Sequence, residues 1–197
     1  MFKFTTILAS IIIGSIGIIK AQTKDIDLAE INENRLQLNQ NGMKVLGGWA
    51  AGNMVAGGIG MSRTSGSVRY FHQMNLAWNG VNLAIAGLGY FGSKKDPSSF
   101  SLTATIREYR SFENILLFNA GLDVGYMATG AYLWERGLRK KSQRLKGYGQ
   151  SLILQGSFLL TFDLIMFFAS RNQSNSLLDS LDGLSLQPGG VSYRKTF

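Results

Sequence analysis

The sequence lacks cysteine and contains little proline, histidine or charge. Its 197 residues include no Cys, two Pro and one His, and only 16% of them are charged. Without Cys, neither a disulfide nor a thiolate metal site can form, and the single imidazole, His72, argues against a zinc site. Motifs of the forms GxxxxGK[ST], GxSxG and HExxH are also absent. We therefore predict no metal, no cofactor and no nucleic-acid partner, and we do not expect an enzyme.

Apolar residues and glycine are abundant instead. The chain is 45% hydrophobic with 24 Gly, and the apolar residues are gathered into blocks of about twenty, the length that spans a bilayer. At the N-terminus, Lys3, an apolar run over residues 7–19 and the small residue Ala21 are typical of a secretory signal peptide over residues 1–21. The mature chain would then begin outside the cytoplasm.

These blocks predict an all-α fold, a four-helix transmembrane bundle preceded by the signal peptide and a short amphipathic helix. The amphipathic periplasmic helix covers residues 22–42, where Asp27 and Glu30 have the form of a capping box. The bundle covers residues 43–169, with spans at 43–61, 71–91, 113–134 and 150–169. Residues 170–197 are rich in Ser, Asn, Asp and Gly, which predicts a disordered or surface-lying tail.

The distribution of basic residues predicts the topology. The segments 62–70 and 135–149 between spans carry eight Lys and Arg, and short loops rich in these residues stay in the cytoplasm. We therefore expect a multi-pass protein of the bacterial inner membrane, in contact with the lipid bilayer, with its mature N-terminus in the periplasm.

Polar side chains recur within the predicted spans. Trp49, Asn53, Gly58 and Gly60 are repeated 29 residues later as Trp78, Asn82, Gly87 and Gly89, while Asp123 and Asp163 lie near the middle of the last two spans. Because successive spans run antiparallel, we expect Asn53, Asn82, Asp123 and Asp163 to meet near the bilayer midplane. With two further amides on the polar faces of the second and third spans, the candidates for ligand or ion binding are Asn53, Asn79, Asn82, Asn119, Asp123 and Asp163.

This layer has two interpretations. No Lys or Arg lies inside the central part of any span, so a buried carboxyl would hold a proton or bind a cation. Asn and protonated Asp also link membrane helices without any further role. The sequence favours a membrane subunit or scaffold with a polar interhelical layer, and the alternative is a protein that binds or translocates a proton, a cation or a small solute. An intramembrane aspartyl peptidase is disfavoured, because Gly121-Leu122-Asp123-Val124 lacks the GxGD pattern.

Small residues on the first span predict a packing face. Gly48, Gly52, Ala56 and Gly60 follow one another at intervals of four, which lets another helix approach closely, in the same chain, a second copy or a membrane partner. His72, beside Tyr70 and Phe71, is an interfacial candidate at the end of the second span.

Several segments resemble a family of small uncharacterised membrane proteins of Bacteroidota. The resemblance covers about residues 36–168 and is carried by GMKVLG at 42–47, YFHQMN at 70–75, LFNAGLDVGY at 117–126 and RLKGYGQS at 144–151. It implies a signal sequence, a four-helix membrane domain and a Gram-negative envelope, and no assigned activity.

Overall fold

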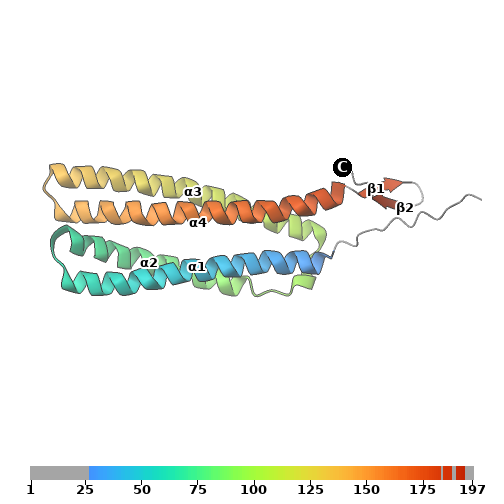
Figure 1. Ribbon diagram of the computed structural model, residues 1–197, viewed down its shortest axis with the longest axis horizontal. Helices are drawn as coiled ribbons and strands as arrows, with labels where there is room; N and C mark the ends of the chain where they lie inside the picture. The colour runs from blue at the N-terminus through green and yellow to red at the C-terminus, as the bar shows by residue number, and fades with distance from the viewer. Residues whose placement is uncertain (1–26, 183, 188–189, 194–197) are drawn as a thin grey trace, which may run out of the picture. The chain divides into compact units, whose positions relative to one another are not determined.

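The described part of the chain forms four long helices, whose arrangement Figure 1 shows. The computed structural model describes residues 27–182, 184–187 and 190–193. The helices are α1 (Leu28–Arg63), α2 (Gly66–Gly92), α3 (Leu102–Arg139) and α4 (Gln143–Asp182), with a short 3-10 helix, η1 (Pro97–Ser99), before α3. Successive helices run antiparallel, so the two tight turns lie at one end and the η1 connection at the other. The all-α, four-helix prediction is confirmed, whereas the predicted signal peptide lies outside the described residues.

The start of α1 follows the predicted capping signal. The Oδ1 atom of Asp27 accepts hydrogen bonds from the backbone N–H groups of Ala29 (2.9 Å) and Glu30 (3.1 Å). These bonds satisfy donors that have no partner within the first turn. The amphipathic helix predicted over residues 22–42 leads without interruption into the first predicted span, because α1 continues to Arg63. A single Gly within a helix costs only about 1 kcal/mol and does not end it.

The connections at the basic end are shorter than predicted. Only Thr64 and Ser65 separate α1 from α2, and Gly66 begins α2 with a φ of 60°, a conformation that glycine adopts without steric cost. Most of the predicted loops at 62–70 and 135–149 is therefore helical. Charged residues end a hydrophobic run but not a helix, because Glu, Lys and Arg are good helix formers.

The predicted disordered or surface-lying tail is wrong for residues 170–182, which continue α4. Ser170, Ser174 and Leu177 are buried there. Farther along, β1 (Leu184–Gln187) and β2 (Gly190–Tyr193) pair antiparallel, with Leu184 opposite Tyr193.

Close backbone contacts between helices occur at glycines other than the predicted ones, between α3 and α4 and, at Gly147, between α4 and α2. A Cβ atom on Gly130 would lie 2.8 Å from the carbonyl oxygen of Gly149, so only glycine allows this approach. By contrast, no described atom lies within 4 Å of a Cβ placed on Gly48 or Gly52. The predicted stripe is thus not the close-packing face within this chain, and only its last glycine, Gly60, meets another helix, at the ring of His72.

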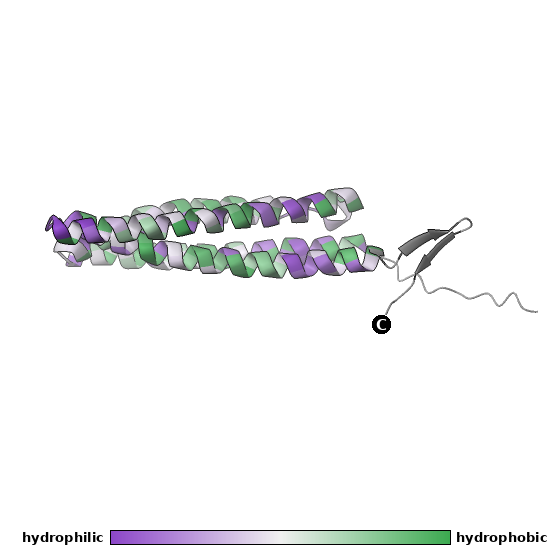
Figure 2. Ribbon diagram, turned by 90° about the horizontal axis from the view of Figure 1, so that it is seen from above, coloured by the Kyte–Doolittle hydropathy of each residue, from purple (hydrophilic) through white to green (hydrophobic). Residues whose placement is uncertain are grey.

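The helices bury polar side chains and expose apolar ones. More polar than apolar side chains are buried, and the apolar core is a small cluster around Leu46, Leu116, Phe162 and Met166. Figure 2 shows an apolar middle section with hydrophilic stretches toward the two ends of the helices. By length and composition, one helix of the described part, α4, qualifies as a membrane span, and 33% of its most apolar stretch is buried. The Gly content of α1 and the polar stripes of α2 and α3 lower the hydropathy of the other predicted spans.

Candidate functional site

Four of the predicted ligand candidates line one cavity. Asn82 comes from α2, Asn119 and Asp123 from α3, and Asp163 from α4, around a volume of about 300 Å³. Asn119 and Asp123 are four residues apart, which places them on one face of α3. Asn53 and Asn79 are not among the lining residues.

The rest of the cavity is apolar and aromatic. Trp78 on α2 and Tyr126 on α3 meet edge to face, with ring centroids 4.7 Å apart. The aliphatic and phenyl side chains that line the cavity are those of Leu46, Val81, Ile85, Leu122, Leu159 and Phe162. No Lys or Arg belongs to the lining.

The two carboxyl groups are buried and both line this cavity. Asp123 is 3% exposed and Asp163 is 6% exposed, and the two side chains interact electrostatically. Two carboxylates held near each other in a buried site repel each other, and a proton shared between them would remove this repulsion. Within the described part of the chain, Oδ2 of Asp123 is buried and has no hydrogen-bond partner. Such an oxygen is costly unless a proton, water or ligand satisfies it.

A second polar cluster is fully hydrogen-bonded and holds Asn53. The Nδ2 atom of Asn75 donates to Oδ1 of Asn53 (2.8 Å), and the Nε2 atom of Gln155 donates to Oδ1 of Asn75. Trp49 donates through its indole N–H to Oε1 of Gln155 (3.1 Å). These bonds join α1, α2 and α4, so this amide cluster (Trp49, Asn53, Asn75 and Gln155) fixes their register.

Asn79 connects the cluster to the cavity along α2. Its Nδ2 atom donates to the carbonyl oxygen of Asn75 (2.8 Å), and its Oδ1 atom accepts from Nδ2 of Asn82 at 3.4 Å. The polar stripe predicted on the second span is therefore one row of hydrogen-bonded amides. Asn75 was visible on that stripe, whereas the role of Gln155 was not, because it depends on which face α4 turns toward α1 and α2.

His72 lies against α1, away from the cavity. Its ring packs on Gly60 and meets Phe71 edge to face, with centroids 5.3 Å apart. Its Nδ1 atom is buried without a hydrogen-bond partner among the described residues. The predicted interfacial residue therefore serves helix packing here.

Sequence reasoning missed an ionic cluster near the η1 end of the helices. Glu113, on α3, is buried and accepts hydrogen bonds from Arg171 (3.0 Å) and Ser174 (2.7 Å) of α4. These partners lie in the segment that was predicted to be a tail. A carboxyl at the start of a predicted span was the available signal for the cluster.

Arg35 and Tyr109 form a related set of contacts at the same end. The guanidinium of Arg35 lies 4.7 Å from the centroid of the Phe100 ring and 3.6 Å from Oε2 of Glu108. Burial lowers the pKa of Arg35, an effect that Glu108 opposes. Burial likewise raises the pKa of Tyr109, whose hydroxyl donates to Gln173 (3.2 Å). All of these groups are structural partners of one another.

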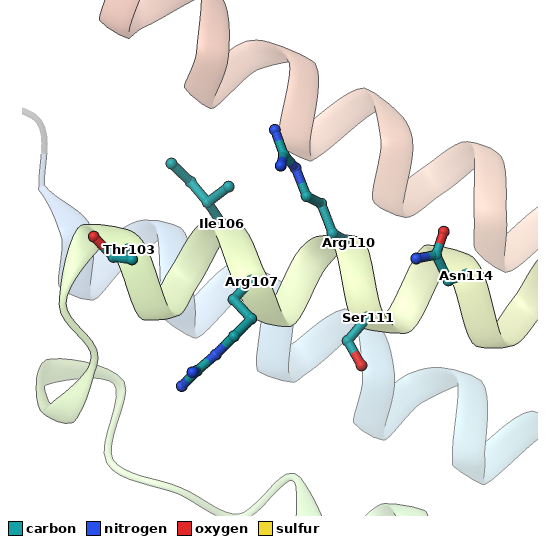
Figure 3. Close-up of a pocket in the computed structure, with 6 residues that line it drawn as sticks. All are labelled: Thr103, Ile106, Arg107, Arg110, Ser111 and Asn114. Atoms are coloured by element: carbon teal, nitrogen blue, oxygen red, sulfur yellow. The ribbon is translucent and has the colours of Figure 1, made fainter.

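A more open pocket lies along the N-terminal part of α3 (Figure 3), with a volume of about 510 Å³. All of its lining residues belong to this one helix: Thr103, Ile106, Arg107, Arg110, Ser111 and Asn114. Apart from Ile106 they are exposed, and in Figure 3 the two arginine side chains extend in different directions. The pocket is a surface groove without a buried polar floor. It differs in this from the cavity lined by Asp123 and Asp163, which we call the carboxyl cavity.

Comparison with known proteins identifies a family and no function. Neither a curated protein nor a solved structure matches the chain. A family of unknown function, DUF6992, matches residues 45–164, which include all of α2 and α3, about half of α1 and of α4, and every residue that lines the carboxyl cavity. The prediction of an uncharacterised family is confirmed: the chain belongs to DUF6992.

Proposed function

We propose that this chain is an integral membrane protein that binds a small cationic or hydrogen-bonding solute at the Asp123–Asp163 pair. The location follows from which side chains face outward. Large apolar side chains are exposed on every helix, among them Val55, Leu88, Phe118 and Phe168, each more than 60% exposed. Soluble monomers rarely expose contiguous apolar patches above a few hundred Å².

The exposed apolar side chains form a band of the height of a bilayer. On α3 they extend from Ile115 to Leu138 and on α2 from Val68 to Phe91. At a rise of 1.5 Å per residue each stretch is about 35 Å long, close to the hydrocarbon thickness of about 30 Å. The ionic cluster of Glu113 and Arg171 lies beyond one end of this band and the basic turn at 140–142 beyond the other. We therefore favour four spans in the inner membrane, with the basic turns in the cytoplasm and the start of α1 in the periplasm.

The single observation that carries the binding function is the unpartnered Oδ2 atom of Asp123 in a cavity whose lining includes no Lys or Arg. In the amide cluster, by contrast, the side chains of Asn53, Asn75 and Gln155 satisfy one another. Residues that only fix helix register gain by such mutual bonding. The carboxyl pair keeps an acceptor free and space beside it, which suits a ligand that brings a proton or a positive charge.

The scaffold function remains the second candidate, supported by two observations. The amide cluster already acts as a register-fixing layer, and the open face of Gly48 and Gly52 leaves a smooth surface on α1 for a second copy or a membrane partner. Peptidase chemistry would also use a pair of carboxyl groups, but the chain lacks the GxGD pattern. We therefore propose binding rather than hydrolysis.

Replacing Asp123 and Asp163 by Asn, singly and together, tests the proposal in reconstituted vesicles. The amide keeps the size and hydrogen-bonding capacity of a protonated carboxyl but cannot ionise. We expect the variants to fold and to lose a pH-dependent or cation-dependent binding or flux signal that the wild type shows. Asp179→Asn, at an exposed carboxylate of the same helix as Asp163, is the matched control and should keep the signal. Equal signals in wild type and double variant, or none in either, would leave the scaffold function.

A further inference from the structure

We propose that the ligand of the carboxyl cavity is an amphipathic organic amine, and that it enters from the lipid side between α2 and α3. This inference rests on the proposed function and specifies its ligand.

The volume argues for an organic molecule. A single water molecule occupies about 30 Å³ in the liquid, so an inorganic cation bound at the carboxyl pair would leave most of the 300 Å³ cavity to be filled by other atoms. Pockets of about 300 Å³ and above are typical of small organic ligands. The apolar side chains of Leu46, Leu159 and Phe162 line this space, and they favour a hydrocarbon body over a string of water molecules.

The polar part of the lining favours a positively charged ligand. The carboxyl pair accepts hydrogen bonds and can carry a negative charge, and no Lys or Arg belongs to the lining to receive an anion. Beside it, Trp78 and Tyr126 bring aromatic rings, which attract ammonium groups through their faces. An ammonium group placed at the unpartnered Oδ2 atom of Asp123 would satisfy that atom. An acid or an uncharged alcohol of the same shape would not supply this charge.

The mouth of the cavity lies in the apolar band. Its outer lining comes from α2 and α3, where Val81 is 61%, Ile85 is 51% and Leu122 is 41% exposed, whereas both carboxyl groups are buried. An amphipathic amine dissolved in the bilayer would meet this apolar rim first. Its head group would then reach the carboxyl pair without crossing the polar ends of the helices.

The test uses the full chain in nanodiscs of uncharged phosphatidylcholine and three probes of one shape. These are trifluoromethyl-terminated hexylammonium, hexanol and hexanoate, followed by fluorine NMR, with empty nanodiscs measuring simple partitioning. We expect saturable binding of the ammonium probe, with affinity for the alcohol lower by about tenfold or more, because a charge-assisted hydrogen bond is lost. Hexanoate should show partitioning only. Equal affinity for the ammonium probe and the alcohol would overturn the assignment of an amine.

Two variants of α2 test the route of entry. Ile85→Phe places a larger side chain at the rim, whereas Leu83→Phe makes the same change at an exposed residue of the same helix that does not line the cavity. We expect Ile85→Phe to slow exchange of the bound ammonium probe severalfold while Leu83→Phe leaves it unchanged. Identical exchange in both variants would overturn entry between α2 and α3.

The outcomes separate this inference from the function on which it rests. If no organic probe binds but the vesicle signal still depends on Asp123 and Asp163, the ligand class is overturned and the proposed function stands. If the vesicle signal is also absent, both are overturned. Binding of the ammonium probe that the double Asn variant abolishes, with folding intact, supports both.

Discussion

At the scale of single residues, the buried polar side chains fall into groups with different expected behaviour. The amide cluster and the contacts of Glu113 are satisfied by partners within the chain, and the carboxyl pair is not. Removing a member of a satisfied group should therefore cost stability, whereas removing the charge of the pair should cost function. Two substitutions test the stability side of this distinction.

Gln155→Leu should destabilise the protein by about 1–3 kcal/mol, because Trp49 loses its acceptor and Asn75 its donor in a buried site. Gln73→Leu is the control, since Gln73 is exposed and accepts a hydrogen bond from the hydroxyl of Tyr148 at the surface. Unfolding in a mixed-detergent titration measures both. Equal unfolding midpoints for the two variants would contradict the role of Gln155 in fixing the register of α1, α2 and α4.

Glu113→Leu should likewise cost about 1–3 kcal/mol, because the hydroxyl of Ser174 loses its acceptor and Arg171 its counter-charge. The loss should be confined to the C-terminal part of α4, which hydrogen exchange in this segment would detect as faster exchange at residues 170–178. Glu33→Leu, at an exposed residue of α1, should leave exchange there unchanged. Unchanged protection in Glu113→Leu would mean that apolar packing alone holds this end of α4.

At the scale of helices, glycine is required for close packing at some positions and lies on an exposed face at others. Glycine is required where α3 and α4 touch, at Gly130 and Gly149, and is exposed at Gly48 and Gly52 of α1. The intervals of four in the sequence identified a smooth face, but they did not identify the face that packs within the chain.

Gly130→Leu should force α3 and α4 apart and reduce the folded fraction in detergent, because its side chain would meet Gly149 and Ile153. Gly52→Leu should leave the fold intact, because nothing described lies near that position. Size-exclusion chromatography with circular dichroism compares the two. A change of oligomeric state in Gly52→Leu, with normal helicity, would indicate that the predicted stripe contacts another chain. Loss of fold in Gly52→Leu would contradict the packing described above.

At the scale of the whole molecule, the exposed apolar band and the basic turns indicate the same membrane topology. The turns at Thr64–Ser65 and 140–142 lie at the same end of the helices, and η1 lies at the other. Among the described residues, eight Lys and Arg lie in or beside the turns at the first end and six lie near the η1 end, a bias in the direction expected for cytoplasmic turns.

Reporter fusions at Gly66 and Lys141 should therefore read cytoplasmic, and fusions at Pro97 and Gln187 periplasmic. Each position is fused to two reporters, one active only in the cytoplasm and one active only in the periplasm. The two readings at each position therefore control for each other. A periplasmic result at Lys141 would invert the proposed orientation. Recovery of the protein in the soluble fraction, without detergent, would overturn the membrane location.

The sequence by itself determined the helices and the identity of the polar residues. The capping signal at Asp27, the apolar blocks and the amide spacing on α2 are local patterns, and local hydrogen bonding and side-chain periodicity follow directly from them. Helix ends were placed less well, because hydropathy reports where a membrane would lie and not where backbone hydrogen bonding stops. Thus α4 was ended at residue 169 although it continues to Asp182.

Only the tertiary structure decided which polar residues meet. Equal depth along antiparallel spans suggested that Asn53 joins Asn82 and the two aspartates, but depth says nothing about the rotation of each helix about its axis. That rotation is set by contacts distant in sequence, such as Gly130 against Gly149 and Trp49 stacked on Phe158. It turns Asn53 toward Asn75 and leaves Asp123 and Asp163 facing a cavity. The separation between a satisfied amide cluster and an open carboxyl pair is therefore a property of packing, because a side chain can be satisfied only by the neighbours that packing brings to it.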